Sequence, residues 1–228
     1  MLFRSFEAGN VFEASGTKSA ERKSICLGGT GSAIEPNVHQ AARPITFFDL
    51  KGDVETLLAA FQADSLCYDA HTSDYYHPGR SARALMDGAT VAQFGQLHPD
   101  IATERKLRQD VFIAELYLDQ LYQHALRQAH YEALPRYPAV ERDFSFIFPD
   151  AVIFQKIQDS VSALGLSELR SFVPVEIFRG GAIPAGKYSI LLRATFQSRE
   201  RTLREDEVAE WSTEIVKALK VLGGEQRI

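Results

Sequence analysis

The sequence contains no long apolar run, and this absence excludes one broad class of protein. No segment approaches the roughly 18 apolar residues that a membrane-spanning helix requires. The amino terminus, MLFRSFEAGN, lacks the basic and then apolar pattern of a secretory signal. We therefore expect a cytoplasmic protein that makes no use of a membrane and is not processed at its amino terminus.

The sequence is also poor in the residue patterns that bind metals or phosphates. Its two cysteines, Cys26 and Cys67, have no C-x-x-C spacing and are expected to be buried and apolar in character. None of the six histidines forms an H-x-x-x-H pair. The glycine-rich stretch GGTGS (28–32) lacks the G-K-[ST] ending of a phosphate-binding loop. We expect no metal site and no cofactor bound by this segment.

The 228 residues present have the composition of a folded protein, with 45% hydrophobic and 24% charged residues. From Arg136 to the end, 13 Lys and Arg balance 13 Asp and Glu, so the residues before it carry the whole net charge of −5. Pro135 and Pro138 separate a helical pattern from an alternating one, and prolines block helix continuation. We therefore expect two domains, residues 1–134 and 135–228.

The second domain shows strand and helix patterns in a definite order. DFSFIF (143–148) alternates like a half-buried strand, and AVIFQKIQDSVSALG has one apolar helical stripe that ends at Gly165. Strand patterns follow in RSFVPVEIF and KYSILLRATFQ, and Thr202 and Glu205 have the spacing of a capping box that opens a second helix. EQRI is long enough for a last strand. The order βαββαβ is that of a ferredoxin-like domain.

One face of this sheet is expected to stay open, because both helices must cover the other face. Alternation places two groups on the open face: Phe172, Glu176 and Phe178 from the second strand, and Ser189, Leu191 and Arg193 from the third, with Val173, Val175, Ile177, Ile190 and Leu192 facing the core. Aromatic residues on such a face stack unpaired bases in several RNA-binding modules. The connections add basic residues: Arg179, Lys187, Arg199, Arg201 and Arg204. The alternative is that these charges are merely solvated and that Phe178 packs under a neighbouring domain.

The first domain is less regular, and we expect a mixed, mainly antiparallel α+β unit. FRSFEAGNVFEA, ERKSICLGGTG and GATVAQFGQLHP have strand patterns, whereas DLKGDVETLLAAFQA has the pattern of a helix that begins near Asp49 to Asp53. DVFIAELYLDQLY alternates at its start and has a helical turn at its end, so it is ambiguous.

The stretch SDYYHPGRSA (73–82) gathers groups that could carry out chemistry. Asp74, His77 and Ser81 are the residue types of a hydrolase site. All three lie in one short segment around a Pro-Gly turn, whereas a nucleophile needs its base aimed from a rigid scaffold. A catalytic site is the less favoured interpretation, but a small hydrolase using His77 and Ser81 stays open as an alternative.

Taken in order, the motifs of the chain resemble the carboxy-terminal portion of the bacterial phenylalanyl-tRNA synthetase beta subunit. FRSFEAGNVFE, FFDLKGDVETLL, YHPGRSA and FGQLHP resemble its non-catalytic class II synthetase-like core, and RYPAVERDFSF, VEIFRG, PAGKYSILLRATFQ and RTLREDEV resemble its ferredoxin-fold anticodon-binding domain. The resemblance spans nearly the whole chain. It implies that this segment has no catalytic residues.

The resemblance also implies partners and site residues. It matches Glu176, Phe178 and Ser189 to the positions that meet the anticodon, where the family more often has Asp in place of Glu176 and Tyr in place of Phe178. Arg179, Lys187, Arg193, Arg199, Arg201 and Arg204 then form a basic rim for the tRNA backbone. The implied partners are the phenylalanine-specific tRNA and an alpha subunit, in an alpha2beta2 heterotetramer that uses ATP and magnesium.

Compared with the family, the chain lacks what precedes its first residue: an amino-terminal tRNA-binding module, an editing domain, and the region with magnesium-coordinating carboxylates. We therefore expect a fragment or a partial gene product that neither aminoacylates nor edits alone. The favoured hypothesis is a tRNA-binding and subunit-assembly segment of a ligase; the alternative is the hydrolase.

Overall fold

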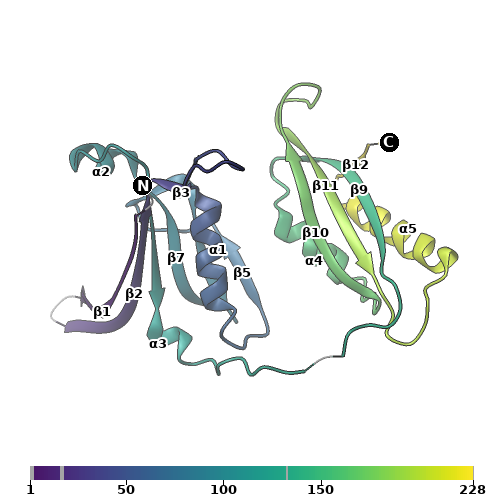
Figure 1. Ribbon diagram of the computed structural model, residues 1–228, viewed down its shortest axis with the longest axis horizontal. Helices are drawn as coiled ribbons and strands as arrows, with labels where there is room; N and C mark the ends of the chain where they lie inside the picture. The colour runs from purple at the N-terminus through teal and green to yellow at the C-terminus, as the bar shows by residue number, and fades with distance from the viewer. Residues whose placement is uncertain (1–2, 16–17, 132, 228) are drawn as a thin grey trace. The chain divides into compact units, whose positions relative to one another are not determined.

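The computed structural model describes residues 3–15, 18–131 and 133–227, which form two compact units, Met1–His130 and Tyr131–Ile228. Figure 1 shows each unit as a sheet with helices packed against it. The fold is α+β with antiparallel sheets, as the sequence patterns predict. No helix among the described residues is both long enough and apolar enough to cross a membrane.

The first unit is built on a six-stranded antiparallel sheet in the order β1-β2-β8-β7-β6-β5. Its elements are β1 (Phe3–Ser15), β2 (Lys18–Thr30), β3 (Ser32–Ile34), β4 (Arg43–Pro44), α1 (Phe47–Leu58), β5 (Leu66–Asp69), β6 (Tyr76–Met86), β7 (Ala89–Leu97), α2 (Pro99–Glu104), β8 (Val111–Tyr117) and α3 (Leu118–Leu121). Helix α1 packs its buried Leu50, Val54 and Leu58 against the middle strands. DVFIAELYLDQLY is both a strand and a helical turn, which explains why its pattern was ambiguous.

Helix α1 begins earlier than the sequence pattern predicts. Thr46 is the N-cap residue, and Asp49 accepts hydrogen bonds from the Thr46 backbone N–H at 2.8 Å and from the Thr46 hydroxyl at 2.7 Å. Arg43 adds two hydrogen bonds of 2.7 Å to the same carboxylate, and the Arg43 guanidinium holds the pKa of Asp49 well below its usual range. Asp49 therefore lies in the first turn as a capping group rather than at the start of the helix.

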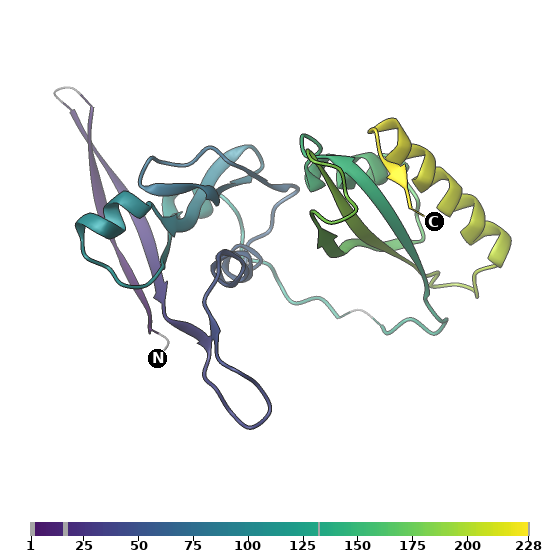
Figure 2. The ribbon, with the colours of Figure 1, turned by 90° about the horizontal axis from the view of Figure 1, so that it is seen from above.

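The second unit has the ferredoxin-like order that the sequence predicts. Its elements are β9 (Val140–Pro149), α4 (Phe154–Ser162), β10 (Leu169–Phe178), β11 (Lys187–Phe196), α5 (Glu205–Val221) and β12 (Glu225–Gln226), and the sheet order is β10-β11-β9-β12. Both helices pack on the same face (Figure 2), where Ile157 and Ile215 meet Phe146 in the core. Within the described part of this unit, the other face of the sheet carries no helix.

A β-bulge in β10 changes which residues face the core. Pro174 pairs with Leu192 and Glu176 pairs with Leu191, so Val175 is an extra residue that reverses the alternation. The prediction that Phe172 lies on the open face is therefore wrong, and Phe172 packs against the core. Val173 pairs with Arg193 on the open face, so the prediction that Val173, Val175 and Ile177 share a core-facing side is wrong as well.

Two smaller predictions are also corrected. Helix α5 has Arg204, not Thr202, as its N-cap residue, and the capping carboxylate is that of Glu207, which accepts from the Arg204 backbone N–H at 3.0 Å. The predicted capping box is therefore placed two residues too early.

Both cysteines are free, but Cys26 is exposed and Cys67 is half-buried, so neither is the buried thiol expected from the sequence.

Candidate nucleic-acid interface

The open face of the second unit presents an aromatic ring. Phe178 ends β10 and pairs with Ser189 of β11, which pairs in turn with Ile147 of β9, so these three residues form one row across the open face. The Phe178 side chain is 50% exposed. Gly181, with φ +58°, lies so close that a Cβ there would be 3.5 Å from the ring. The loop therefore supports one side of the ring and leaves part of it accessible to a ligand.

Ser189 lies beneath an arginine that the sequence reasoning missed. Its side chain is only 5% exposed, and its hydroxyl accepts a hydrogen bond from Arg227 Nη1 at 3.2 Å. Arg227 follows β12 and is held there by its backbone N–H, which donates to the Ser145 carbonyl at 2.8 Å. Alternation in EQRI puts Glu225 and Arg227 on the same side of the last strand, and the pairing of Glu225 with Ile147 shows that this side is the open face.

Glu176 lies on the open face as predicted, opposite Leu191 and exposed. The predicted trio thus differs in accessibility. Glu176 and Phe178 are exposed, whereas Ser189 is reached past the guanidinium of Arg227. A ligand stacked on Phe178 would meet a carboxylate on one strand and a hydroxyl with a guanidinium on the next.

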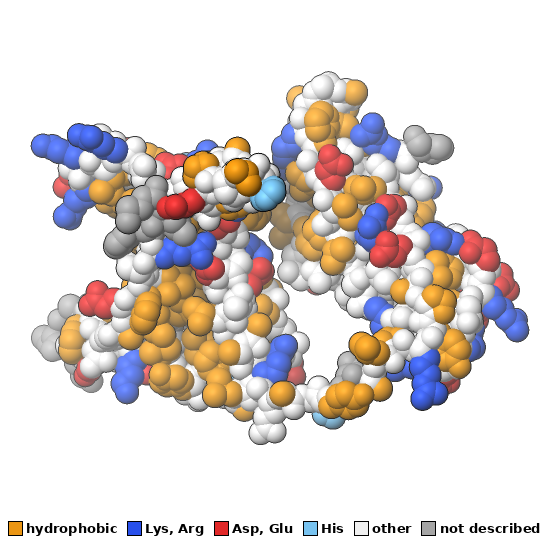
Figure 3. All heavy atoms as spheres, in the orientation of Figure 1, with side chains coloured by type: hydrophobic (Ala, Val, Ile, Leu, Met, Phe, Trp, Pro, Cys, Tyr) orange, Lys and Arg blue, Asp and Glu red, His pale blue; other side chains and the backbone are white. Residues whose placement is uncertain are grey.

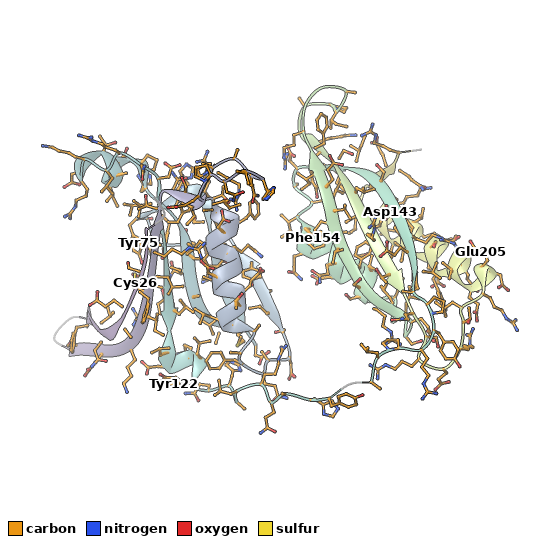
Figure 4. All side chains as sticks on the ribbon, in the orientation of Figure 1. Cys26, Tyr75, Tyr122, Asp143, Phe154 and Glu205 are labelled. Atoms are coloured by element: carbon orange, nitrogen blue, oxygen red, sulfur yellow. The ribbon has the colours of Figure 1, made fainter. Side chains whose placement is uncertain are left out.

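An ion-pair cluster of one cation and two carboxylates occupies part of the open face. Arg193 donates to both oxygens of Asp143, at 2.7 and 2.8 Å, and lies 3.3 Å from Glu141 (Asp143 is labelled in Figure 4). Arg193 holds the pKa of Asp143 below its usual value. A bidentate pair of this kind positions both groups firmly. Arg193 is therefore already engaged, although it lies where the sequence predicts.

Most of the predicted basic rim is likewise ion-paired. Lys187 Nζ lies 2.6 Å from Glu225, Arg201 forms two hydrogen bonds of 2.7 Å with Glu207, and Arg179 pairs with Asp150. Arg199 and Arg204 are exposed in the connection before α5. A phosphate approaching this rim would have to share or displace carboxylates, so the formal number of basic residues overstates its attraction for RNA.

The SDYYHPGRSA stretch is not the loop that the sequence suggests. From Tyr76 it belongs to β6, where Tyr76 pairs with Leu97 and Ser81 with Gly95, so residues 77–80 bulge out between these pairs. The Ser81 hydroxyl donates to the His77 carbonyl oxygen at 2.8 Å, and His77 Nδ1 accepts from the Gly79 N–H at 3.0 Å. The imidazole therefore bonds the backbone of its own bulge, and His77 and Ser81 do not form the base–nucleophile pair of a hydrolase.

The tyrosines of that stretch support the sheet. Tyr75, labelled in Figure 4, donates to Glu115 at 2.7 Å, and the buried Tyr76 donates to the Gln93 carbonyl at 2.9 Å. Burial raises the pKa of both hydroxyls well above the ordinary value, so they stay protonated as donors. No group of three or more His, Cys, Asp or Glu among the described residues is placed to hold a metal ion.

Two family models match the chain, one to each unit. Residues 2–118 match the model described as the phenylalanyl tRNA synthetase beta chain CLM domain, and residues 135–227 match the ferredoxin-fold anticodon binding domain.

Curated relatives named phenylalanine–tRNA ligase beta subunit match over most of the chain. The protein of Clostridium acetobutylicum is 28% identical over 99% of this chain, and those of Xylella fastidiosa and Xanthomonas campestris are 33% and 34% identical over 95% and 90% of it. The chain spans 28%, 27% and 26% of these relatives, about a quarter of their length. These matches confirm the resemblance found in the motifs, and the chain belongs to the phenylalanyl-tRNA synthetase beta-chain family.

Proposed function

We propose that this chain is a tRNA-binding and subunit-assembly segment of a phenylalanine–tRNA ligase. The observation that carries the proposal is the half-exposed ring of Phe178 beside Ser189 and Arg227, on the open face of a domain that matches an anticodon-binding family. Stacking on an aromatic ring and hydrogen bonding to base edges are the means by which proteins recognise unpaired RNA bases. An anticodon loop offers bases in that state.

In this proposal each side chain of the open face has a distinct role. Phe178 stacks on one anticodon base, Glu176 accepts a hydrogen bond from a base amino group, and Ser189 with Arg227 meets a base edge or the adjoining phosphate. Arg179, Lys187, Arg193, Arg199, Arg201 and Arg204 contribute the surrounding field rather than base identity.

The whole enzyme would need further parts. Attachment of phenylalanine to its tRNA, with ATP and magnesium, would be carried out by a partner alpha subunit in an alpha2beta2 assembly that works in the cytoplasm. The first domain, residues 1–134, would contribute to assembly, and residues 135–228 would meet the tRNA. Relatives bearing the ligase name support this reading.

The test is a titration of the purified chain with phenylalanine-specific tRNA at two salt concentrations, with an unrelated tRNA as the control. We expect tighter binding of the cognate tRNA and a steep loss of affinity with salt, because phosphate contacts release counterions. Equal binding of both tRNAs would overturn anticodon reading by this face.

No observation favours the hydrolase alternative, since Ser81 bonds a carbonyl oxygen rather than an imidazole. Substituting alanine for His77 or Ser81 should leave tRNA binding unchanged in protein that remains folded. The hydrolase hypothesis would be supported if the wild type hydrolysed simple esters and either substitution abolished this activity.

A further inference from the structure

A cluster of cations on the first unit has no role in the proposed anticodon site. Arg105, Lys106 and Arg108 follow helix α2 directly, and all three are exposed. Figure 3 shows Lys and Arg side chains gathered at the end of the unit where Figure 1 places α2. We call these three residues the α2 basic tip.

The cations of the α2 basic tip differ from those of the predicted rim in having no partner. Within residues 3–15, 18–131 and 133–227, none of the three side chains forms an ion pair or a hydrogen bond, whereas Lys187, Arg193 and Arg201 are all paired with carboxylates. Asp100, Glu104 and Asp110 lie nearby in the sequence and balance the formal charge of the segment. The carboxylates are therefore present, but the three cations are left to solvent or to a ligand.

The backbone at Lys106 supplies a second, independent observation. The Leu107 N–H donates to the Ala102 carbonyl at 2.9 Å and the Lys106 N–H to the Thr103 carbonyl at 3.0 Å, which is the Schellman pattern that ends a helix. Lys106 occupies the left-handed position of that motif, with φ +55°, where glycine is usual because a Cβ is strained there.

Asp87, in the same unit, shows how a side chain can be used at a position with positive φ. Among the described residues, Asp87 is the other non-glycine residue with positive φ, and its carboxylate accepts from the Ser65 N–H at 2.7 Å. That contact, together with the tolerance of Asp for this conformation, accounts for Asp87. Lys106 makes no contact of this kind, so its side chain occupies a strained position without a structural use. Strain of this sort is a pointer to a binding role.

Next to the tip is a groove of about 310 Å³ whose lining includes Arg108, Arg80 and one carboxylate, that of Asp110. Arg80 donates to the neutral amide of Gln96 at 2.9 Å, so its charge is not cancelled there. The groove thus continues the line of cations from the tip toward the body of the unit.

We propose that the α2 basic tip contacts the phosphate backbone of RNA, as a second RNA surface separate from the anticodon face. This inference rests on the proposed function, which supplies an RNA ligand. Lys and Arg contacts to phosphate carry no base identity, so the tip adds affinity to any RNA that reaches it and leaves discrimination to the second unit. An acidic protein segment is the alternative partner, and the test below distinguishes it from RNA.

The experiment compares full-length variants in titrations with phenylalanine-specific tRNA over a series of salt concentrations. Each phosphate contact adds about 0.7–0.9 to the slope with which log affinity falls against log salt concentration. The loss of one contact therefore lowers the affinity at 0.1 M salt by about sixfold. R105Q/K106Q/R108Q should therefore make the slope shallower by about two to three. The matched control, K156Q/K217Q/K220Q, removes the same charge from exposed positions on helices α4 and α5 and should change the slope much less.

A single substitution separates binding from folding. Lys106→Gly relieves the left-handed strain, so the melting temperature should stay the same or rise while the affinity falls about sixfold at 0.1 M salt. Loss of affinity together with loss of the fold would overturn the proposal, because the side chain would then be structural.

The remaining outcomes separate the two proposals. If the wild type shows no preference for the phenylalanine-specific tRNA over the unrelated tRNA, the proposed function fails. If the wild type shows that preference but the tip variants have the same salt slope as the control triple variant, only the proposal for the α2 basic tip is refuted. If the tip variants keep their tRNA affinity but lose retention on immobilised polyglutamate, the tip serves an acidic protein and the RNA proposal is wrong.

Discussion

Replacing Phe178 with alanine tests the proposed reading surface most directly. If the ring stacks on one anticodon base, Phe178→Ala should weaken tRNA binding by about 1–3 kcal/mol, or roughly 5- to 150-fold in Kd. The same change should have a small effect on stability, because the side chain is 50% exposed at the end of an edge strand. Deleting a fully buried ring costs about 3–5 kcal/mol, and we expect roughly 1 kcal/mol here.

The neighbouring residue provides a matched control. Ile177 is 58% exposed on the same strand but pairs with Ile190, so its side chain lies on the opposite side of the sheet from Phe178. Ile177→Ala should cost a similar small amount of stability and leave tRNA affinity unchanged. Phe178→Tyr should bind normally, because it keeps the ring.

The assay is fluorescence anisotropy with the phenylalanine tRNA and with a tRNA carrying a substituted anticodon, paired with urea unfolding of each variant. If Phe178→Ala binds both tRNAs like the wild type, the open face is not the reading surface. If Ile177→Ala loses as much affinity as Phe178→Ala, the loss reports a disturbed strand rather than a lost stack.

Three further predictions concern folding. Gly95→Ala should destabilise the chain by about 1–3 kcal/mol, because the new Cβ would lie 2.6 Å from the Arg80 carbonyl oxygen. Gly52→Ala in helix α1 should instead stabilise it by up to about 1 kcal/mol, because nothing lies within 4 Å of the new Cβ. Urea unfolding midpoints compare the two variants, and a shift of both midpoints in the same direction would contradict the geometry. Arg201 and the Arg204 backbone N–H lower the pKa of Glu207 from 4.5 to about 2. The contribution of Glu207 to stability is therefore fully present above about pH 4.5 and is lost as the pH falls toward 2. Glu207→Gln should flatten this part of the pH–stability profile, and an unchanged profile would show that Glu207 does not cause it. Residues 135–228 should fold alone, because their helices and strands share one core; absence of a cooperative unfolding transition in the excised segment would refute this.

Several features of the fold follow from local sequence. DFSFIF predicts a strand with one buried side, and Phe144, Phe146 and Phe148 are all buried in the core. The two helices and the order of elements in the second unit are confirmed for the same reason: each pattern has the period of its own element and needs no knowledge of its neighbours. Ile157 and Ile215, from the two stripes, are fully buried.

Other features were decided by contacts between residues far apart in the sequence. The bulge at Val175 arises in the pairing of β10 with β11, and it moves Phe172 inward and Val173 outward although the alternation of apolar residues does not mark it. Alternation predicts a face only while the pairing is regular, because one extra residue reverses every side chain on one side of it.

The interactions within the candidate site also depend on contacts between residues far apart in the sequence. Arg193 meets Asp143, Lys187 meets Glu225, and Arg227 reaches Ser189, each through strands that the sheet brings together. The sequence by itself placed Glu176, Phe178, Ser189 and Arg193 on the open face. Only the folded sheet decided which of their charges remain available to a ligand, because an ion pair forms between the carboxylate and the cation that the strand order makes neighbours, whatever their separation along the chain.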